Sequence, residues 1–233
     1  GNNPTEPNKT VQKTTDEQIL PGEPNESNEE LPEPSGPGVD VYVAEKQTGN
    51  PLADVTVKTY INGGRAEYIT DSKGHARIEL GEKKVTYVSL SFARASYVPL
   101  HIAWQVKGRG HVIPESFDVK MATGTKIGGT VLNEADQPVA DATVYVHAPR
   151  EAKPGQLNVR IHDYPVKTDE QGKWVCDIMP ENLAEYSLAL KLTHPDYADD
   201  VSYRWQGSLP PVEKLRDISA VFYMKKGFDV SGY

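Results

Sequence analysis

Histidine, carboxylate and cysteine side chains are the groups that could give this chain of 233 residues a hydrolytic or metal-dependent chemistry. A zinc-dependent peptidase of the His-x-x-Glu type needs two residues between its ligands, but three separate His111 from Glu115, and one of them is Pro114. No His-Glu-x-x-His, nucleophile elbow or phosphate-binding loop occurs. Cys176 lies beside Trp174 in an alternating apolar run, which predicts a small buried residue and not a nucleophile. We therefore expect no enzyme, no cofactor and no metal ligand.

Three aromatic residues are candidate ligand contacts, because sandwich modules that bind sugars display aromatic rings on one face or loop. Tyr203 and Trp205 lie in a stretch without clean alternation, which is compatible with exposed rings. Packing against a neighbouring module is the favoured use of these two rings, and carbohydrate binding is the alternative. Trp104 follows Leu100 and Ile102 at a spacing of two residues, so all three lie on the same face of a strand. We therefore expect Trp104 to point into the core, with a ligand role as the alternative.

The chain also repeats itself, which predicts tandem small modules. Three pairs of segments correspond: 50–57 with 137–144, 70–74 with 168–172, and 121–129 with 224–232. The second pair has the form Thr-Asp-x-x-Gly, a turn in which the carboxylate accepts backbone N–H groups and glycine takes positive φ. Calcium binding is the alternative, but one carboxylate per turn falls short of the six or more oxygens that calcium takes.

Short alternating runs separated by turn residues predict the strands that position these groups. In the first module we expect strands at 39–43, 55–59, 66–70, 75–80, 85–92, 99–106 and 116–121. The third and fourth are expected to pair as a hairpin across the Thr-Asp-x-x-Gly turn. The second module follows the same order, with strands at 173–178, 187–193 and 219–224, an insertion around 148–155, a short helical turn near 180–183 and an excursion at 209–216.

Composition separates an acidic tail from the rest of the chain. Residues 1–38 hold eight acidic residues, two lysines and seven of the eighteen prolines, so we expect them to be disordered. The net charge of -8 lies mainly there, and no basic patch favours nucleic acid. No run approaches the roughly 18 apolar residues of a membrane span. A single cysteine excludes an internal disulfide.

The second repeat resembles a carboxypeptidase regulatory-like domain, which has a transthyretin-like (prealbumin-like) β-sandwich. The segments that carry the resemblance are Gly129-Thr130-Val131, Pro138 to Val144, Lys167 to Trp174, and His194 to Tyr197. The first repeat matches more loosely, with Val55 where the family usually has alanine, and the resemblance covers about 39–225. With its Pro114-to-Phe117 lead-in, the array is similar to those of Planctomycete-type envelope proteins, some of which are fused to a membrane metallopeptidase sensor. The resemblance implies an accessory extracytoplasmic module and no catalytic residue.

An intradiol dioxygenase is the enzymatic rival, because that family shares the sandwich. Its chemistry needs ferric iron held by two tyrosines and two histidines, and the candidates are Tyr145, Tyr164, His147, His162 and His194. The His-x-His pair of that family is missing, and no other two histidines are close enough in sequence to replace it. The sequence therefore disfavours this activity.

Together these observations predict an all-β chain with two tandem prealbumin-like (Ig-like) β-sandwiches after a disordered tail. The expected divisions are 1–38 for the tail, 39–122 and 123–226 for the sandwiches, and 227–233 for the start of a third repeat. We expect a monomeric, extracytoplasmic module (periplasmic, cell-surface or secreted) that acts as a spacer and as a protein-protein or adhesive interaction unit. A carbohydrate-binding module that contacts a cell-surface polysaccharide, and a sensor ectodomain, are the alternatives.

Overall fold

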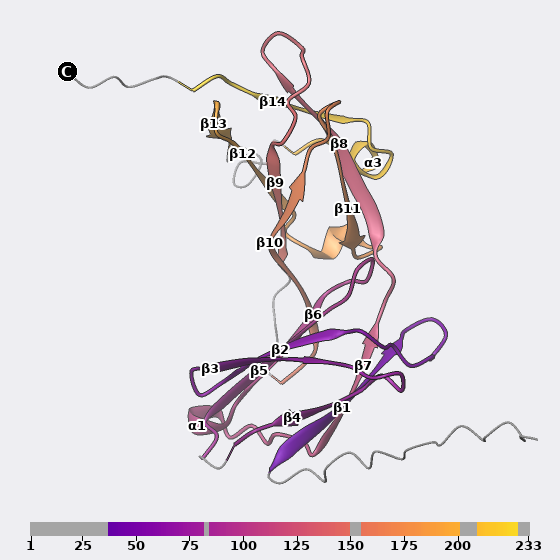
Figure 1. Cartoon of the computed structure of the whole chain (residues 1–233), viewed down its shortest axis with the longest axis vertical. Helices are drawn as coiled ribbons and strands as arrows, with labels where there is room; N and C mark the ends of the chain where they lie inside the picture. Colours follow the sequence, from indigo (N-terminus) through magenta and orange to yellow (C-terminus); the bar gives the residue numbers. More distant parts are fainter. Residues whose placement is uncertain (1–36, 82–83, 150–154, 201–208, 228–233) are drawn as a thin grey trace, which may run out of the picture. The chain divides into compact units, whose positions relative to one another are not determined.

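The computed structural model describes residues 37–81, 84–149, 155–200 and 209–227 (Figure 1). The acidic tail up to residue 36, the candidates Tyr203 and Trp205, and the last six residues of the expected third repeat lie outside the described residues. The prediction of an all-β chain is confirmed. The elements are β1 (Gly38–Glu45), β2 (Thr56–Ile61), β3 (Gly64–Ile69), β4 (His75–Glu79), β5 (Tyr87–Ala93), β6 (Leu100–Gln105), α1 (Val106–Arg109), β7 (Ser116–Met121), β8 (Thr125–Asn133), β9 (Thr143–Pro149), β10 (Asn158–Lys167), β11 (Lys173–Met179), the 3-10 turn η1 (Leu183–Glu185), β12 (Ala189–His194), β13 (Tyr197–Asp200), α3 (Val212–Arg216) and β14 (Ala220–Met224).

The first half of the chain packs two sheets around one hydrophobic core. One sheet has the order β4-β1-β7, and facing it the strands run β6-β5-β2-β3. Val39, Val41 and Val43 of β1 are at most 1% exposed while Asp40 and Tyr42 face outward, which is the alternation expected of a half-buried strand. Buried residues of this core lie between positions 39 and 121.

The second half repeats this arrangement around a core of its own. Here β11-β8-β14 form one sheet and β13-β12-β9-β10 the other. Trp174 and Phe222 fill the space between them, with ring centroids 5.8 Å apart. Buried residues of this core lie between positions 127 and 224.

One strand pairing joins the two halves into a single long sheet. The start of β10 pairs antiparallel with β6, where Asn158 lies opposite His101 and Val159 opposite Leu100. Leu157 and Val159 also pack against the core of the first half. The segment that follows the insertion at 148–155 therefore contacts the neighbouring sandwich, which the sequence did not predict.

The predicted hairpin at 66–80 is wrong. The strand before the Thr-Asp-x-x-Gly turn, β3, pairs with β2, whereas the strand after it, β4, pairs with β1 in the opposite sheet. The turn carries the chain from one sheet to the other across the edge of the core. Local turn residues specify a change of direction, but they do not specify which strands then pair.

The two Thr-Asp-x-x-Gly turns are pinned in the same way in both halves. The Thr70 hydroxyl donates to the Leu52 carbonyl at 2.7 Å and accepts from the Val55 N–H at 3.0 Å. In the second half, the Thr168 hydroxyl donates to the Val139 carbonyl at 2.8 Å and accepts from the Ala142 N–H at 2.9 Å. Each buried threonine thus ties its turn to the other repeated segment, the Pro-x-Ala-Asp loop.

The aspartate and the glycine of each turn meet local demands of the backbone. Asp169 accepts from the N–H groups of Gln171 and Lys173 at 2.9 Å and 2.8 Å, so its carboxylate is already used within the turn. Gly172 has φ +69°, and a Cβ there would lie 2.4 Å from the Val131 carbonyl oxygen. The interpretation of this motif as a structural turn is supported over the calcium alternative.

Candidate functional site

Of the three aromatic candidates from the sequence, Trp104 is buried, whereas Tyr203 and Trp205 lie outside the described residues. Trp104 is 4% exposed and stacks edge-on against Phe117, with ring centroids 5.4 Å apart. Trp174 is 1% exposed. The expectation that Trp104 points into the core is confirmed, Trp174 is also buried, and neither ring offers a face to a ligand.

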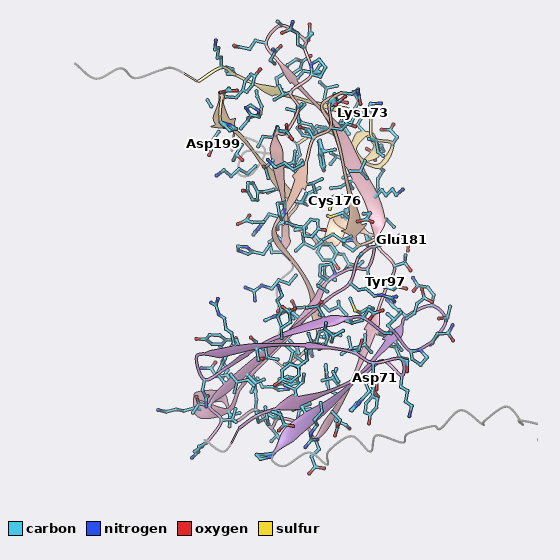
Figure 2. All side chains as sticks on the ribbon, in the orientation of Figure 1. Asp71, Tyr97, Lys173, Cys176, Glu181 and Asp199 are labelled. Atoms are coloured by element: carbon cyan, nitrogen blue, oxygen red, sulfur yellow. The ribbon has the colours of Figure 1, made fainter. Side chains whose placement is uncertain are left out.

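Cys176 also lies in the second core (Figure 2), where it is 1% exposed. Burial raises the pKa of its thiol to about 11, because the thiolate would lose its hydration there. At neutral pH the side chain is a protonated, buried thiol, which agrees with the prediction of a small apolar residue and not a nucleophile.

Two of the isolated histidines have local roles in the backbone. His111 accepts the Gln105 N–H at 3.0 Å through Nδ1, and His194 accepts the Asp196 N–H at 3.1 Å. Neither bond involves a carboxylate. These two side chains hold turns at the ends of strands.

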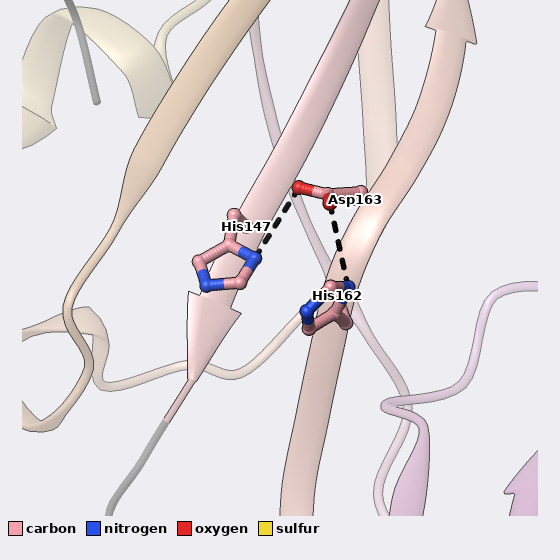
Figure 3. A group of neighbouring side chains, drawn as sticks. All are labelled: His147, His162 and Asp163. Atoms are coloured by element: carbon pink, nitrogen blue, oxygen red, sulfur yellow. Dashed lines mark ion pairs between the residues drawn. The ribbon is translucent and has the colours of Figure 1, made fainter.

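The described residues do contain one group of metal-ligating side chains, on β9 and β10 of the second sandwich (Figure 3). His147, His162 and Asp163 each offer a ligand atom, and these atoms lie within 4.8 Å of one another. The imidazole rings meet edge to face, with centroids 4.7 Å apart and an interplanar angle of 72°. The assumption that paired histidines must be close in sequence was wrong, because antiparallel strands bring His147 and His162 together across the sheet.

A β-bulge creates this group. Ile161 pairs with Ala148 and Tyr164 with Val146, so two residues of β10, His162 and Asp163, lie opposite the single residue His147 of β9. Val146 and Ala148 are fully buried in the core, and His147 between them therefore lies on the outer face of the sheet. The additional residue in β10 interrupts its alternation and turns both His162 and Asp163 toward that face.

Asp163 has a backbone conformation that few residues adopt. Its φ is +49°, in the left-handed region, where aspartate and asparagine are the most tolerated residues after glycine. The carboxylate lies between the two rings, with Oδ1 3.4 Å from Nδ1 of His147 and Oδ2 3.4 Å from Nδ1 of His162. Non-glycine residues held in such conformations concentrate at functional sites.

The group opens onto a cleft of about 460 Å³ that is lined by both sandwiches. Further histidines and arginines reach this cleft: His101, His111, Arg109 and Arg160. Apolar side chains such as Ala103, Val159 and Ile161 make up much of the remaining wall. The imidazoles are the groups in this cleft that suit transition metals better than alkaline-earth ions.

His101 occupies the cleft wall as a neutral imidazole. Arg160 Nη1 lies 3.1 Å from its Nε2, and because arginine can only donate, Nε2 must be the acceptor. The proton is then on Nδ1, which donates to the Ser91 hydroxyl at 2.9 Å. Burial, with the Arg160 charge as the second cause, lowers the pKa of His101 to about 4.

Sequence reasoning named His147 and His162 among the candidate ligands of one iron but rejected a histidine pair, and it overlooked Asp163 entirely. The available signal was the His162-Asp163 dipeptide within a strand, because two adjacent polar residues break a two-residue alternation and can mark a bulge. Of the other dioxygenase candidates, Tyr164 follows Asp163 in β10 and is 41% exposed, while two lie elsewhere. Tyr145 lies under Lys191, whose Nζ is 5.9 Å from the ring centroid, and His194 caps a turn at the end of β12.

No protein-family model matches the chain, and no curated protein matches it. Solved structures with some similarity include a streptococcal ancillary pilin (12% identity, TM-score 0.33, covering 82% of this chain and 62% of the pilin). The Bacillus anthracis TIE protein is another, with 18% identity, a TM-score of 0.29, and coverage of 81% of this chain and 32% of that protein. The shaft pilin SpaA of Lactobacillus rhamnosus GG has 11% identity, a TM-score of 0.29, and coverage of 83% of this chain and 98% of the pilin. The chain thus spans less than two thirds of the first two proteins. Likeness at this level carries no argument about what this chain does.

Helices in the described part of the chain are short. None of them is long and apolar enough to cross a membrane.

Proposed function

We propose that the chain comprises two carboxypeptidase regulatory-like β-sandwiches, 39–122 and 123–226, that act without catalysis as a spacer and a protein-protein or adhesive interaction unit of a larger extracytoplasmic protein. The observation that best supports this proposal is the pairing of the terminal strands. In the first sandwich β1 and β7 are parallel neighbours over 40–45 and 116–121. In the second, β8 and β14 are parallel neighbours over 129–133 and 220–224.

Parallel terminal strands suit a module that transmits tension. The chain enters such a sandwich at one end of the pair and leaves at the other, so pulling on the termini shears the two strands past each other. All the ladder hydrogen bonds then bear the load together, although each contributes only about 1 kcal/mol. Antiparallel neighbours pulled from their adjacent ends would instead separate one bond at a time.

The load path runs directly from one sandwich into the next. Met121 ends β7 and Thr125 begins β8, with three residues between them. Ala122 accepts the Val98 N–H at 2.9 Å, and the Gly124 N–H donates to the carbonyl of Ser96 at 2.8 Å. A connection this short and this well bonded supports a joint with restricted freedom.

Carbohydrate binding rests on Tyr203 and Trp205, which lie outside the described residues, and no described residue favours it or a sensor role. We therefore retain the spacer as the proposed function. We also propose that the module is monomeric and extracytoplasmic, with its specificity for a protein partner or a surface polysaccharide carried by exposed loops.

Single-molecule pulling in two directions tests this proposal. Handles at residues 37 and 122 load the parallel β1–β7 pair in shear, and handles at 37 and 79 load the antiparallel β1–β4 pair from its adjacent ends, where Gly38 lies opposite Glu79. We expect a clearly higher rupture force in the first geometry. Equal forces in the two directions would contradict the proposed mechanical role, because the same core would then resist any load equally.

A further inference from the structure

The bulge in β10 assembles a set of donor atoms that suits a specific class of ion. Two imidazoles and one carboxylate form a mixed nitrogen and oxygen set, which divalent first-row transition metals prefer. Calcium takes six to eight oxygen ligands, and magnesium prefers water and carboxylate oxygens, so neither suits this set.

The spacing of these atoms is closer to that of a coordination site than to that of hydrogen bonds. Each imidazole Nδ1 lies 3.4 Å from an oxygen of Asp163, which is longer than the usual 2.7–3.2 Å of an N–H···O bond. Bonds of about 2.1 Å in tetrahedral geometry place neighbouring ligand atoms about 3.4 Å apart. Because Oδ1 faces His147 and Oδ2 faces His162, an Asp163 that binds through one oxygen accounts for one edge of such a tetrahedron, and the other imidazole must shift toward that oxygen.

The movement that brings all three ligand atoms to bonding distance is small. Three atoms that are all within 4.8 Å of one another fit inside a circle about 2.8 Å in radius, so an ion at its centre is within roughly 0.7 Å of bonding distance to each. The His162 side chain is 59% exposed and is free to make that adjustment, whereas that of His147, at 19%, provides a fixed position.

The bulge and the left-handed backbone at Asp163 set the direction of its carboxylate, and among the described non-glycine residues with positive φ, Asp163 is the one that lies in this group. A bulge with a left-handed residue is a costly way to continue a strand, and here it orients one carboxylate oxygen toward each imidazole. We propose that His147, His162 and Asp163 bind one divalent first-row transition-metal ion, of which Zn²⁺ is the representative, with the remaining coordination position open toward the cleft.

Such an ion would bridge β9 and β10, the two strands that flank the inserted segment. Because the ion binds the folded strands and not the unfolded chain, its binding should raise the melting temperature of the second sandwich. The open position would take a water molecule or a donor atom from a bound partner. This proposal is independent of the mechanical role of the terminal strands.

The test is a titration of the full chain, without a histidine tag, with Zn²⁺, Ni²⁺ and Cu²⁺ in competition with a chromogenic chelator, and with Ca²⁺ and Mg²⁺ as comparison ions. Two variants remove ligands with little risk to folding. His162→Ala removes an exposed side chain, and Asp163→Asn retains a residue type that tolerates the left-handed backbone. His194→Ala is the matched control, because it removes a histidine outside the group.

We expect one equivalent of transition metal per chain, a higher melting temperature with Zn²⁺, and no response to Ca²⁺ or Mg²⁺. Each ligand variant should weaken binding by about tenfold or more and reduce the thermal shift, while His194→Ala binds as the parent chain does. Two results would overturn the proposal. One is the absence of saturable binding up to on the order of 100 µM free ion, and the other is binding that His162→Ala and Asp163→Asn leave unchanged.

Discussion

The buried histidine of the cleft wall predicts how the stability of this protein changes with pH. His101 is 8% exposed, and its ring is held neutral between Ser91 and Arg160. Protonation would place a second proton on Nε2, directly against the arginine that donates to it. The folded state therefore resists protonation until about pH 4, whereas in the unfolded chain the same imidazole titrates at its ordinary value of 6.5.

The direction and size of the effect follow from this difference. Between pH 6.5 and about 4 the unfolded state binds more protons than the folded state, so stability falls as the pH falls through that interval and is fully present above it. The shift corresponds to roughly 3 kcal/mol in total, of which about 2 kcal/mol should be lost between pH 7 and pH 5.

Urea unfolding followed by tryptophan fluorescence measures this loss, because Trp104 and Trp174 report on the two cores. His101→Gln retains an acceptor for Arg160 but does not titrate, and it serves as the reference. The free energy of unfolding of the parent chain minus that of the variant should fall by about 2 kcal/mol from pH 7 to pH 5. A difference that does not change with pH, or that grows as the pH falls, would refute the assignment of His101 as a neutral imidazole.

Three further predictions concern the turns and the buried thiol. Gly172→Val should lower the free energy of unfolding by about 2 kcal/mol or more, since its Cβ would meet a backbone carbonyl at 2.4 Å. Gly155 has φ +75° but open space around it, so Gly155→Ala should lower the free energy of unfolding by less in the same chemical denaturation experiment. Thr168→Val should cost about 2–4 kcal/mol by leaving a buried amide and a buried carbonyl without their bridging hydroxyl, and an unchanged midpoint would count against the proposed pinning of the turn. Cys176 should not react with a thiol reagent at pH 8 until urea unfolds the chain, and rapid labelling of the native protein would show that the thiol is accessible.

The repeats in the sequence were sufficient to predict the fold class and the turns. Alternation in β1 and the parity of Trp104 depend on a two-residue period, which is a local property of the chain, and both predictions are confirmed. The pairing of β3 and β4 was not predictable in this way. A turn such as Asp71 to Gly74 is compatible with a hairpin and with a crossing between sheets, and burial of the neighbouring Thr70 favours the crossing only once the core is known.

The candidate site lay beyond sequence reasoning for a different reason. A bulge changes the register by one residue, and one residue decides which face of the sheet a side chain occupies. His147 and His162 are in neighbouring strands, but their contact also depends on the left-handed Asp163. The pairing of β10 with β6 similarly joins segments whose relation no local pattern encodes.

The most direct test of the spacer proposal is to pull the whole tandem between residues 37 and 227 and to record the length gained at each rupture. If each sandwich bears load through its own parallel pair, two separate events should appear. Unfolding of 38–121 should release about 280 Å and unfolding of 125–224 about 330 Å, from about 3.6 Å per extended residue less the folded length of the terminal strands. Gradual extension without resolved ruptures would contradict the proposal that these sandwiches transmit tension in series.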